Sequence, residues 1–234
     1  MCFSAGASFA GGAVLSAIGI AAVKRAHDPS LKLFAGIPLF FAFQQCAEGI
    51  LWLTLKSGGN YEIQTIVTYI FLIMALVIWP LMIPLAILRM EEVKKKKMII
   101  TGILIAGGFL SAYYAYCLLS CNVSPRINAF HIQYVNDFPV SLANVAFGIY
   151  LVATIAPLFI SSVKRMYLFG ILIFISCFVT GIFYKEYLTS VWCFFAAFIS
   201  IVVYWIIRES QEEFSLADLK LSKIITDHNP WKKG

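Results

Sequence analysis

Seven long apolar runs dominate the sequence and determine its fold class. They lie at roughly 5–23, 33–55, 63–88, 98–119, 139–162, 167–184 and 188–207. About 20 apolar residues in a helix cross the roughly 30 Å of hydrocarbon in a bilayer. The 234-residue chain is 61% hydrophobic and 13% charged, with a mean hydropathy of +0.85, which excludes a water-soluble globular enzyme. We therefore predict an all-α membrane protein, with a bundle of seven transmembrane helices in residues 1–208.

The basic residues predict how this bundle is oriented. Of the 18 Lys and Arg residues, 15 lie in the linkers 24–32, 89–97 and 163–166 or in the tail after the last run. The other side holds only Lys56, Arg126 and Lys185. Because positive charge marks the cytoplasmic side, we predict that the N-terminus is outside and the C-terminus is cytoplasmic. This topology accounts for the net charge of +6 without a nucleic-acid partner.

Local signals refine three of the segments. Ser4 is a predicted N-cap of the first helix, and this run has no positive charge before it, so we expect it to be retained rather than cleaved as a signal peptide. The third run is long and contains Pro80 and Pro84, which predicts a tilted or kinked helix. Ser215 followed by Asp218 resembles a capping box, so residues 209–234 are predicted to be a cytoplasmic tail with a short amphipathic helix at the membrane interface.

Glu48 is the only acidic residue inside a predicted span. An ionisable group in lipid costs at least a few kcal/mol, which makes it a functional candidate. Gln44, Gln45 and Trp52 are three or four residues away from Glu48 and share a helical face with it. This face is predicted to point away from lipid, either into a polar cavity or into a hydrogen-bonded clamp between helices.

Other polar and aromatic residues fall at the same depth as Glu48, in the outer half of the membrane. Their shared depth predicts a ligand-binding cavity open to the outer face, although some Tyr and Trp residues there are also typical of the interfacial belt. The predicted ligand-binding residues are Gln44, Gln45, Glu48, Trp52, Tyr69, Tyr113, Asn144, Tyr184 and Trp192.

The linker between Ser120 and Pro139 is too apolar over 127–134 for a free loop. We predict that it folds back as a cap over the outer mouth of the cavity, with His131 as a pH-sensitive lid residue. An exposed loop histidine is the alternative.

Cysteine and histidine usage limits the chemistry that the chain can perform. The three histidines, His27, His131 and His228, lie in separate linkers and the tail, so no metal site and no cofactor is predicted. Neither GxSxG nor HExxH occurs. Cys2 has two interpretations: a small apolar residue at the membrane edge, or an N-terminal nucleophile once Met1 is removed. A disulfide between Cys2 and Cys121 is also compatible with their common side.

Three short motifs resemble a known group of proteins. They are Met1-Cys2-Phe3-Ser4-Ala5 with Ala7-Ser8-Phe9, then Gln44-Gln45 with Glu48-Gly49 and Trp52, and finally Trp192-Cys193-Phe194-Phe195-Ala196-Ala197. The chain resembles a family of small bacterial seven-helix membrane proteins whose function is unknown. The resemblance implies a multi-pass protein of the bacterial inner (plasma) membrane and directs attention to Cys2, Ser4, Gln45, Glu48 and Trp192.

Two functions and a third, structural role follow as expectations. The first is binding of a small molecule or lipid in the outer cavity by a sensor or carrier, with membrane lipids as the other partners. The second is an intramembrane enzyme that acts on a lipid-borne substrate through Cys2 or Glu48 as catalytic residues. The third is a structural subunit that docks through the basic run 94–97 and the tail helix, although this run is more simply a topology anchor.

Overall fold

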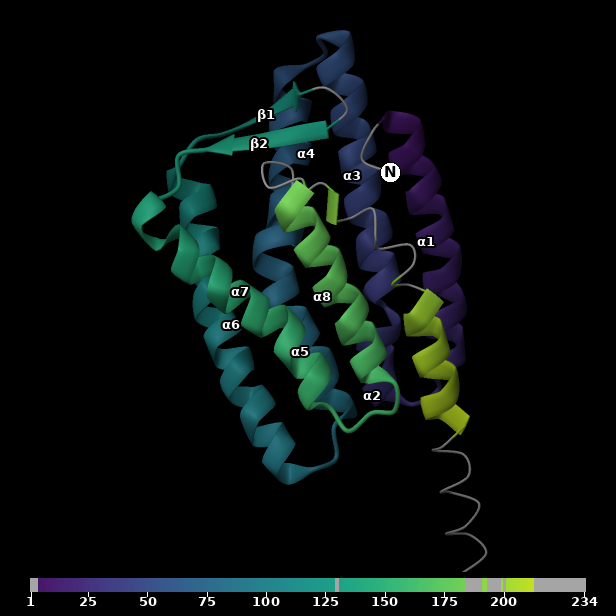
Figure 1. Cartoon of the computed structure of the whole chain (residues 1–234). Helices are drawn as coiled ribbons and strands as arrows, with labels where there is room; N and C mark the ends of the chain where they lie inside the picture. Colours follow the sequence, from purple (N-terminus) through teal and green to yellow (C-terminus); the bar gives the residue numbers. More distant parts are fainter. Residues whose placement is uncertain (1–3, 129–130, 184–190, 193–198, 200, 213–234) are drawn as a thin grey trace, which may run out of the picture.

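The computed structural model shows a bundle of long helices capped at one end by a β-hairpin (Figure 1). It describes residues 4–128, 131–183, 191–192, 199 and 201–212. The elements are α1 Ala5–Arg25, α2 Pro29–Ala35, α3 Ile37–Ser57, α4 Tyr61–Leu72, the π-helical turn η1 Ile73–Ile78, α5 Trp79–Met90, α6 Lys94–Ser120, β1 Val123–Asn128, β2 His131–Asn136, α7 Val140–Ile160 and α8 Met166–Phe183. Residues 201–212 are also helical.

Six of the seven predicted spans are confirmed as helical stretches long and apolar enough to cross a membrane. They are Ala5–Arg25, Pro29–Ser57, Tyr61–Met90, Lys94–Ser120, Val140–Ile160 and Met166–Phe183. Half of the seventh predicted span, 188–207, lies outside the described residues, as does the tail helix predicted after Ser215. Consecutive stretches run in opposite directions, so their linkers alternate between the two ends of the bundle (Figure 1).

The outer surface of these helices is apolar. Phe109 on α6 is 76% exposed, and large side chains such as Phe178 and Ile182 on α8 are also exposed. Contiguous apolar surface of this kind is unfavourable in water and favourable against lipid. Together with the six long helices, it indicates a membrane-embedded protein.

One end of the bundle carries most of the positive charge, and we call it the basic end. It contains the linkers 26–28, 91–93 and 161–165, the start of α6 with Lys94–Lys97, and the end of the 201–212 helix. The helix at 201–212 contacts two of these linkers. The Gln211 Oε1 accepts the backbone N–H of His27 at 3.1 Å, and Glu209 forms an ion pair with Arg165 at 2.6 Å. The linkers 26–28, 91–93 and 161–165 therefore lie at the same end of the folded chain, and the orientation of this end stays a prediction.

A buried carboxylate joins two of the linkers at the basic end. Glu91 is only 1% exposed and follows the last residue of α5. Its Oε1 accepts the N–H groups of Glu92 and Val93, and its Oε2 accepts the N–H of Ser162 at 2.6 Å. Burial raises the pKa of this carboxyl, but the hydrogen bonds from the Ser162, Val93 and Glu92 backbone outweigh it, so the pKa lies below the ordinary value. Glu91 thus fastens the α5–α6 turn to the α7–α8 turn.

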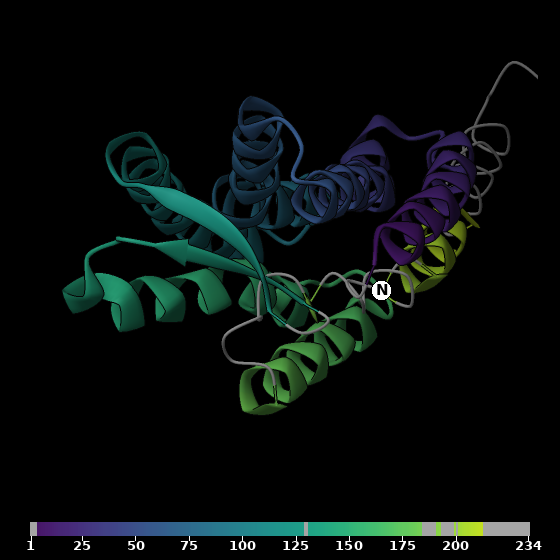
Figure 2. The same cartoon turned by 90° about the horizontal axis from the view of Figure 1, so that it is seen from above.

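The opposite end, the hairpin end, is covered by the two antiparallel strands. Their register runs from Val123 opposite Asn136 to Asn128 opposite His131, and the strands lie across the helix ends (Figure 2). Tyr134 stacks on Phe71 of α4 with ring centroids 4.9 Å apart. The segment thus folds as a hairpin over the helix ends, so the all-α prediction is wrong here: in β1 half-buried residues alternate with exposed ones, which is the period of a strand. Its role as a cap over an outer cavity mouth stays a prediction.

One smaller sequence prediction, the N-cap of the first helix, is confirmed. The Ser4 hydroxyl accepts the Ala7 N–H at 3.2 Å, which makes it the N-cap of α1. The π-helical η1 turn is followed directly by α5, which has Pro80 in its first turn and Pro84 inside it, and the tilt or kink of this stretch stays a prediction.

Candidate functional site

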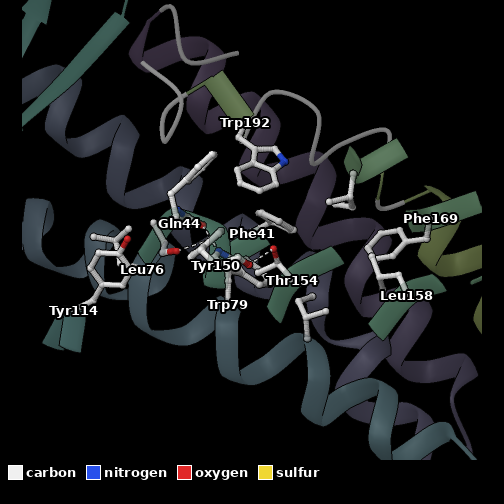
Figure 3. Close-up of a pocket in the computed structure, with 14 residues that line it drawn as sticks. Phe41, Gln44, Leu76, Trp79, Tyr114, Tyr150, Thr154, Leu158, Phe169 and Trp192 are labelled. Carbon is white, nitrogen blue, oxygen red and sulfur yellow. Dashed lines mark hydrogen bonds between the residues drawn. The ribbon is translucent and has the colours of Figure 1, made fainter. Parts of the chain in front are cut away.

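A cavity of about 240 Å³ lies in the middle of the bundle, and we call it the aromatic cavity (Figure 3). It is bounded by α3, by the η1 turn and α5, by α6, α7 and α8, and by Trp192. Its fourteen lining residues are Phe41, Gln44, Ala75, Leu76, Trp79, Ile83, Tyr114, Phe147, Tyr150, Thr154, Leu158, Phe169, Ile173 and Trp192.

The η1 turn shapes one wall of the cavity. Here the Trp79 N–H bonds to the Met74 carbonyl, five residues back, which is the π-helical spacing. In the same spacing the Ala75 carbonyl would meet the nitrogen of Pro80, which carries no hydrogen. The Tyr150 hydroxyl of α7 donates to this carbonyl instead, at 2.7 Å. The proline therefore leaves an acceptor that a side chain from another helix satisfies.

A second tie holds the η1 turn against α6. The Ser111 hydroxyl donates to the Val77 carbonyl at 2.8 Å. Further along, Gly107 of α6 lies directly against the Pro80 carbonyl, where a β-carbon would clash. Pro84 has no N–H to donate to that carbonyl in the α-helical pattern. These contacts fix the position of Trp79 at the start of α5.

Gln44 is the polar group that α3 contributes to the cavity. It is 1% exposed. The Trp79 Nε1–H donates to its Oε1 at 3.1 Å (Figure 3). Because an indole N–H can only donate, the Gln44 atom that it meets must be the carbonyl oxygen, and this fixes the orientation of the amide. The Nε2 group has no hydrogen-bond partner within the described part of the chain.

Aromatic rings form much of the remaining wall. Phe41 stacks on Trp79 with centroids 4.1 Å apart and an interplanar angle of 26°. Tyr150 and Trp192 meet edge to face at 6.0 Å. The Thr154 hydroxyl donates to the Tyr150 carbonyl one turn earlier, at 2.8 Å. None of the fourteen lining residues is charged. The cavity is therefore suited to a neutral, mostly apolar molecule.

The predicted ligand-binding residues do not all converge on this cavity. Gln44 and Trp192 line it. Gln45, Glu48 and Trp52 are almost completely buried but are not among its lining residues, and neither are the half-buried Tyr69 and Tyr113. Asn144 is exposed on α7. Tyr184 lies outside the described residues. The cavity is thus centred on Gln44 and Trp79 instead of on Glu48.

Gln45 faces α1 instead of the cavity. A β-carbon on Gly12 of α1 would lie 3.6 Å from the Gln45 Cβ, which shows how closely the two helices pack. Both amide atoms of Gln45, the Ser8 hydroxyl and the Trp52 indole nitrogen are buried without a hydrogen-bond partner in the described chain. Viewed down the axis of α3, the Glu48 side chain projects between those of Gln44 and Gln45. It therefore lies between the aromatic cavity and the contact of α3 with α1.

The hairpin places His131 in a protected position. This residue is 8% exposed, and its neighbour Ile132 packs with Leu51, Trp52 and Val67 of α3 and α4. Burial lowers the pKa of His131 below its ordinary value, which favours the neutral imidazole. The alternative of an exposed loop histidine is therefore wrong, and the predicted lid role of His131 stays a prediction.

The reactive groups proposed from the sequence stay untested. Cys2 and Cys193 lie outside the described residues, and Cys46, Cys117, Cys121 and Cys177 carry free thiols. Among the described residues, no group of three or more His, Cys, Asp or Glu side chains is placed to hold a metal.

The cavity is also lined by residues that were not predicted from the sequence, among them Phe41, Trp79, Tyr150 and Thr154. Two features of the sequence point to three of these residues. Trp79 directly precedes Pro80, at a helix disruption, and Tyr150 and Thr154 are one turn apart in an otherwise apolar run. The prediction rested on polar residues in the outer half of the predicted spans. The cavity instead lies near the middle of the helices, where the sequence has few polar residues.

Comparison with known proteins yields one family match. A model described as "Family of unknown function (DUF6629)" matches residues 1–217. No curated protein and no solved structure matches the chain.

Proposed function

We propose that this chain, which belongs to the DUF6629 family of unknown function, is a binding protein. In this proposal it is a multi-pass plasma-membrane protein that holds one small, mostly apolar molecule in the aromatic cavity, as a sensor or carrier does. The hairpin end lies outside, and the basic end lies in the cytoplasm.

The observation that carries the proposal is an open, aromatic-walled space held by hydrogen bonds between different helices. Bundle cores are normally close-packed, and an engineered cavity of about 150 Å³ in another protein already binds benzene. The aromatic cavity is larger, at about 240 Å³. Bonds such as Tyr150 to Ala75 and Trp79 to Gln44 keep its walls in place without a ligand, which favours binding because little ordering is needed.

The enzyme alternative has less support. It requires Cys2 or Glu48 to meet a substrate, yet Cys2 lies outside the described residues and Glu48 does not line the cavity. The lining residues contain no thiol, carboxylate or imidazole. We therefore favour binding over catalysis.

Filling the cavity tests the binding proposal. Ala75→Leu adds three carbons at the wall and leaves the Ala75 carbonyl available to Tyr150. We expect native mass spectrometry of wild-type protein from mild detergent to show one small molecule bound per chain, and Ala75→Leu to lack it. Ala112→Leu makes the same change on the exposed face of α6 and should retain the adduct. An empty wild-type protein, or an adduct that survives in Ala75→Leu, contradicts the proposal.

Cysteine labelling tests the orientation. Ser124 on β1 and Lys95 at the start of α6 are both exposed, at opposite ends of the bundle. We expect a membrane-impermeant maleimide to label Ser124→Cys on intact cells and to label Lys95→Cys only after lysis, in a chain whose Cys2 and Cys121 are replaced by serine. The reverse pattern would place the basic end outside and overturn the topology.

A further inference from the structure

We propose that the ligand of the aromatic cavity is a neutral, ring-bearing carbonyl compound, whose oxygen accepts a hydrogen bond from the Gln44 Nε2 group. This inference rests on the proposed binding function and deepens it, because it specifies the chemistry that the cavity selects. It follows from which polar atoms in the wall are already engaged and which are not.

Three polar hydrogens of the wall are already engaged in hydrogen bonds within the protein. Trp79 Nε1–H is engaged with the Gln44 oxygen, the Tyr150 hydroxyl with the Ala75 carbonyl, and the Thr154 hydroxyl with the Tyr150 carbonyl. Because the Trp79 indole N–H donates to the Gln44 Oε1, exchanging the positions of the amide oxygen and nitrogen would leave this buried N–H without an acceptor. The Gln44 Nε2 group therefore stays a donor.

The other polar groups of the wall strengthen this bias. Tyr114 and Trp192 also line the cavity, and their hydroxyl and indole N–H can both donate. No lining residue carries a charge. An ionic ligand would lose its hydration without gaining a counter-charge, at a cost of several kcal/mol. The wall thus favours a neutral molecule that accepts hydrogen bonds.

The shape of the cavity specifies the rest of the ligand. The stacked Phe41–Trp79 pair and the edge-to-face Tyr150–Trp192 pair present flat ring surfaces. Ring faces pack well against a planar conjugated molecule. The volume of about 240 Å³ exceeds the roughly 150 Å³ of a benzene-binding cavity, so two fused rings are the appropriate size for a probe.

Three naphthalene derivatives of one skeleton separate these requirements. 2-Acetylnaphthalene offers a carbonyl, 2-ethylnaphthalene has nearly the same shape without one, and 2-naphthoate carries a charge. Binding is measured by equilibrium dialysis against protein in lipid nanodiscs, as the excess over empty nanodiscs. We expect the ketone to bind roughly tenfold more tightly than the hydrocarbon, the effect of one neutral hydrogen bond, and naphthoate to bind weakest.

Variants of the donor and its neighbour identify the source of the preference. Gln44→Met removes the Nε2 donor and keeps an unbranched side chain, so the preference for the ketone over the hydrocarbon should be largely lost. Gln45→Met makes the same change at the adjacent position, which faces α1, and should preserve the tenfold preference. If Gln44→Met does not fold, Trp79→Phe serves instead: it keeps a ring against Phe41 and releases the amide, so the preference should fall several-fold.

The outcomes separate the two proposals. A wild-type protein that binds the hydrocarbon as tightly as the ketone, a preference for naphthoate, or a ketone preference that survives Gln44→Met overturns the carbonyl inference while leaving a binding cavity. Failure of all three compounds to bind overturns the proposed function itself.

Discussion

Gly107→Ala is expected to destabilise the bundle by about 3 kcal/mol, near the upper end for overpacking. The added β-carbon would clash with the Pro80 carbonyl, which is backbone and cannot turn aside as a side chain can. Relieving the clash would push α6 from α5 at the point where Trp79 enters the cavity wall. The measurement is the free energy of unfolding in mixed micelles, followed by helical circular dichroism.

The next residue along α6 provides a matched control. A β-carbon on Gly108 would lie 3.8 Å from the Leu81 side chain, an ordinary van der Waals contact. Since alanine favours a helix over glycine, Gly108→Ala should be neutral or stabilising by up to about 1 kcal/mol. Equal effects of the two substitutions would show that glycine content, and not the contact with Pro80, determines the stability of this region.

Glu91→Leu is the second change with a large expected effect. It removes the acceptor of three backbone N–H groups at the basic end, one of them the N–H of Ser162 in the α7–α8 turn. Hydrogen bonds to a buried carboxylate are stronger than neutral ones, so we expect a loss of about 3 kcal/mol in the free energy of unfolding. The same change at the exposed neighbour Glu92 should stay within about 0.5 kcal/mol.

Glu91 also predicts how stability depends on pH. Its pKa is lower in the folded chain than in the unfolded chain, so its contribution is complete above the unfolded value of about 4.3 and is lost as the pH falls through the folded value. Wild-type stability should therefore decline below about pH 5 more steeply than that of Glu91→Gln. Parallel acid profiles for the two proteins would mean that the carboxylate does not hold the two turns together.

The six confirmed helices could be predicted because composition alone requires them. A run of about 20 apolar residues has few alternatives to a helix in lipid, where every backbone group must be bonded. The hairpin was harder to predict, since its two strands are short and separated by only two residues. It was expected as a cap because its residues are apolar, but not as strands.

The candidate site could be predicted only in part. The position of a residue along a membrane span gives its depth, but it does not give the direction in which its side chain points from the helix. Gln44 and Gln45 are adjacent in the sequence, yet one lines the cavity and the other faces α1. Asn144 has a suitable depth but is exposed on α7, and this helix is so apolar that its sequence does not distinguish the face that becomes buried. Glu48 was the most conspicuous residue, whereas the cavity formed beside it, around Gln44 and Trp79.

The bonds that build the cavity depend on contacts between distant segments. Tyr150 and Ala75 are 75 residues apart, and Gln44 and Trp79 are 35 residues apart. The Trp79-Pro80 step signals that a carbonyl will be left without its helical partner, but it does not say which helix will supply the donor. Only the packing of α7 against η1 and α5 answers that question.

The most direct test of the central claim is an experimental density map of the full chain in lipid nanodiscs, purified without added ligand. We expect non-protein density in the aromatic cavity, between Trp79 and Trp192 and within hydrogen-bonding distance of the Gln44 Nε2 group. A cavity closed by protein side chains, with Gln44 bonded to another residue through Nε2, would contradict it.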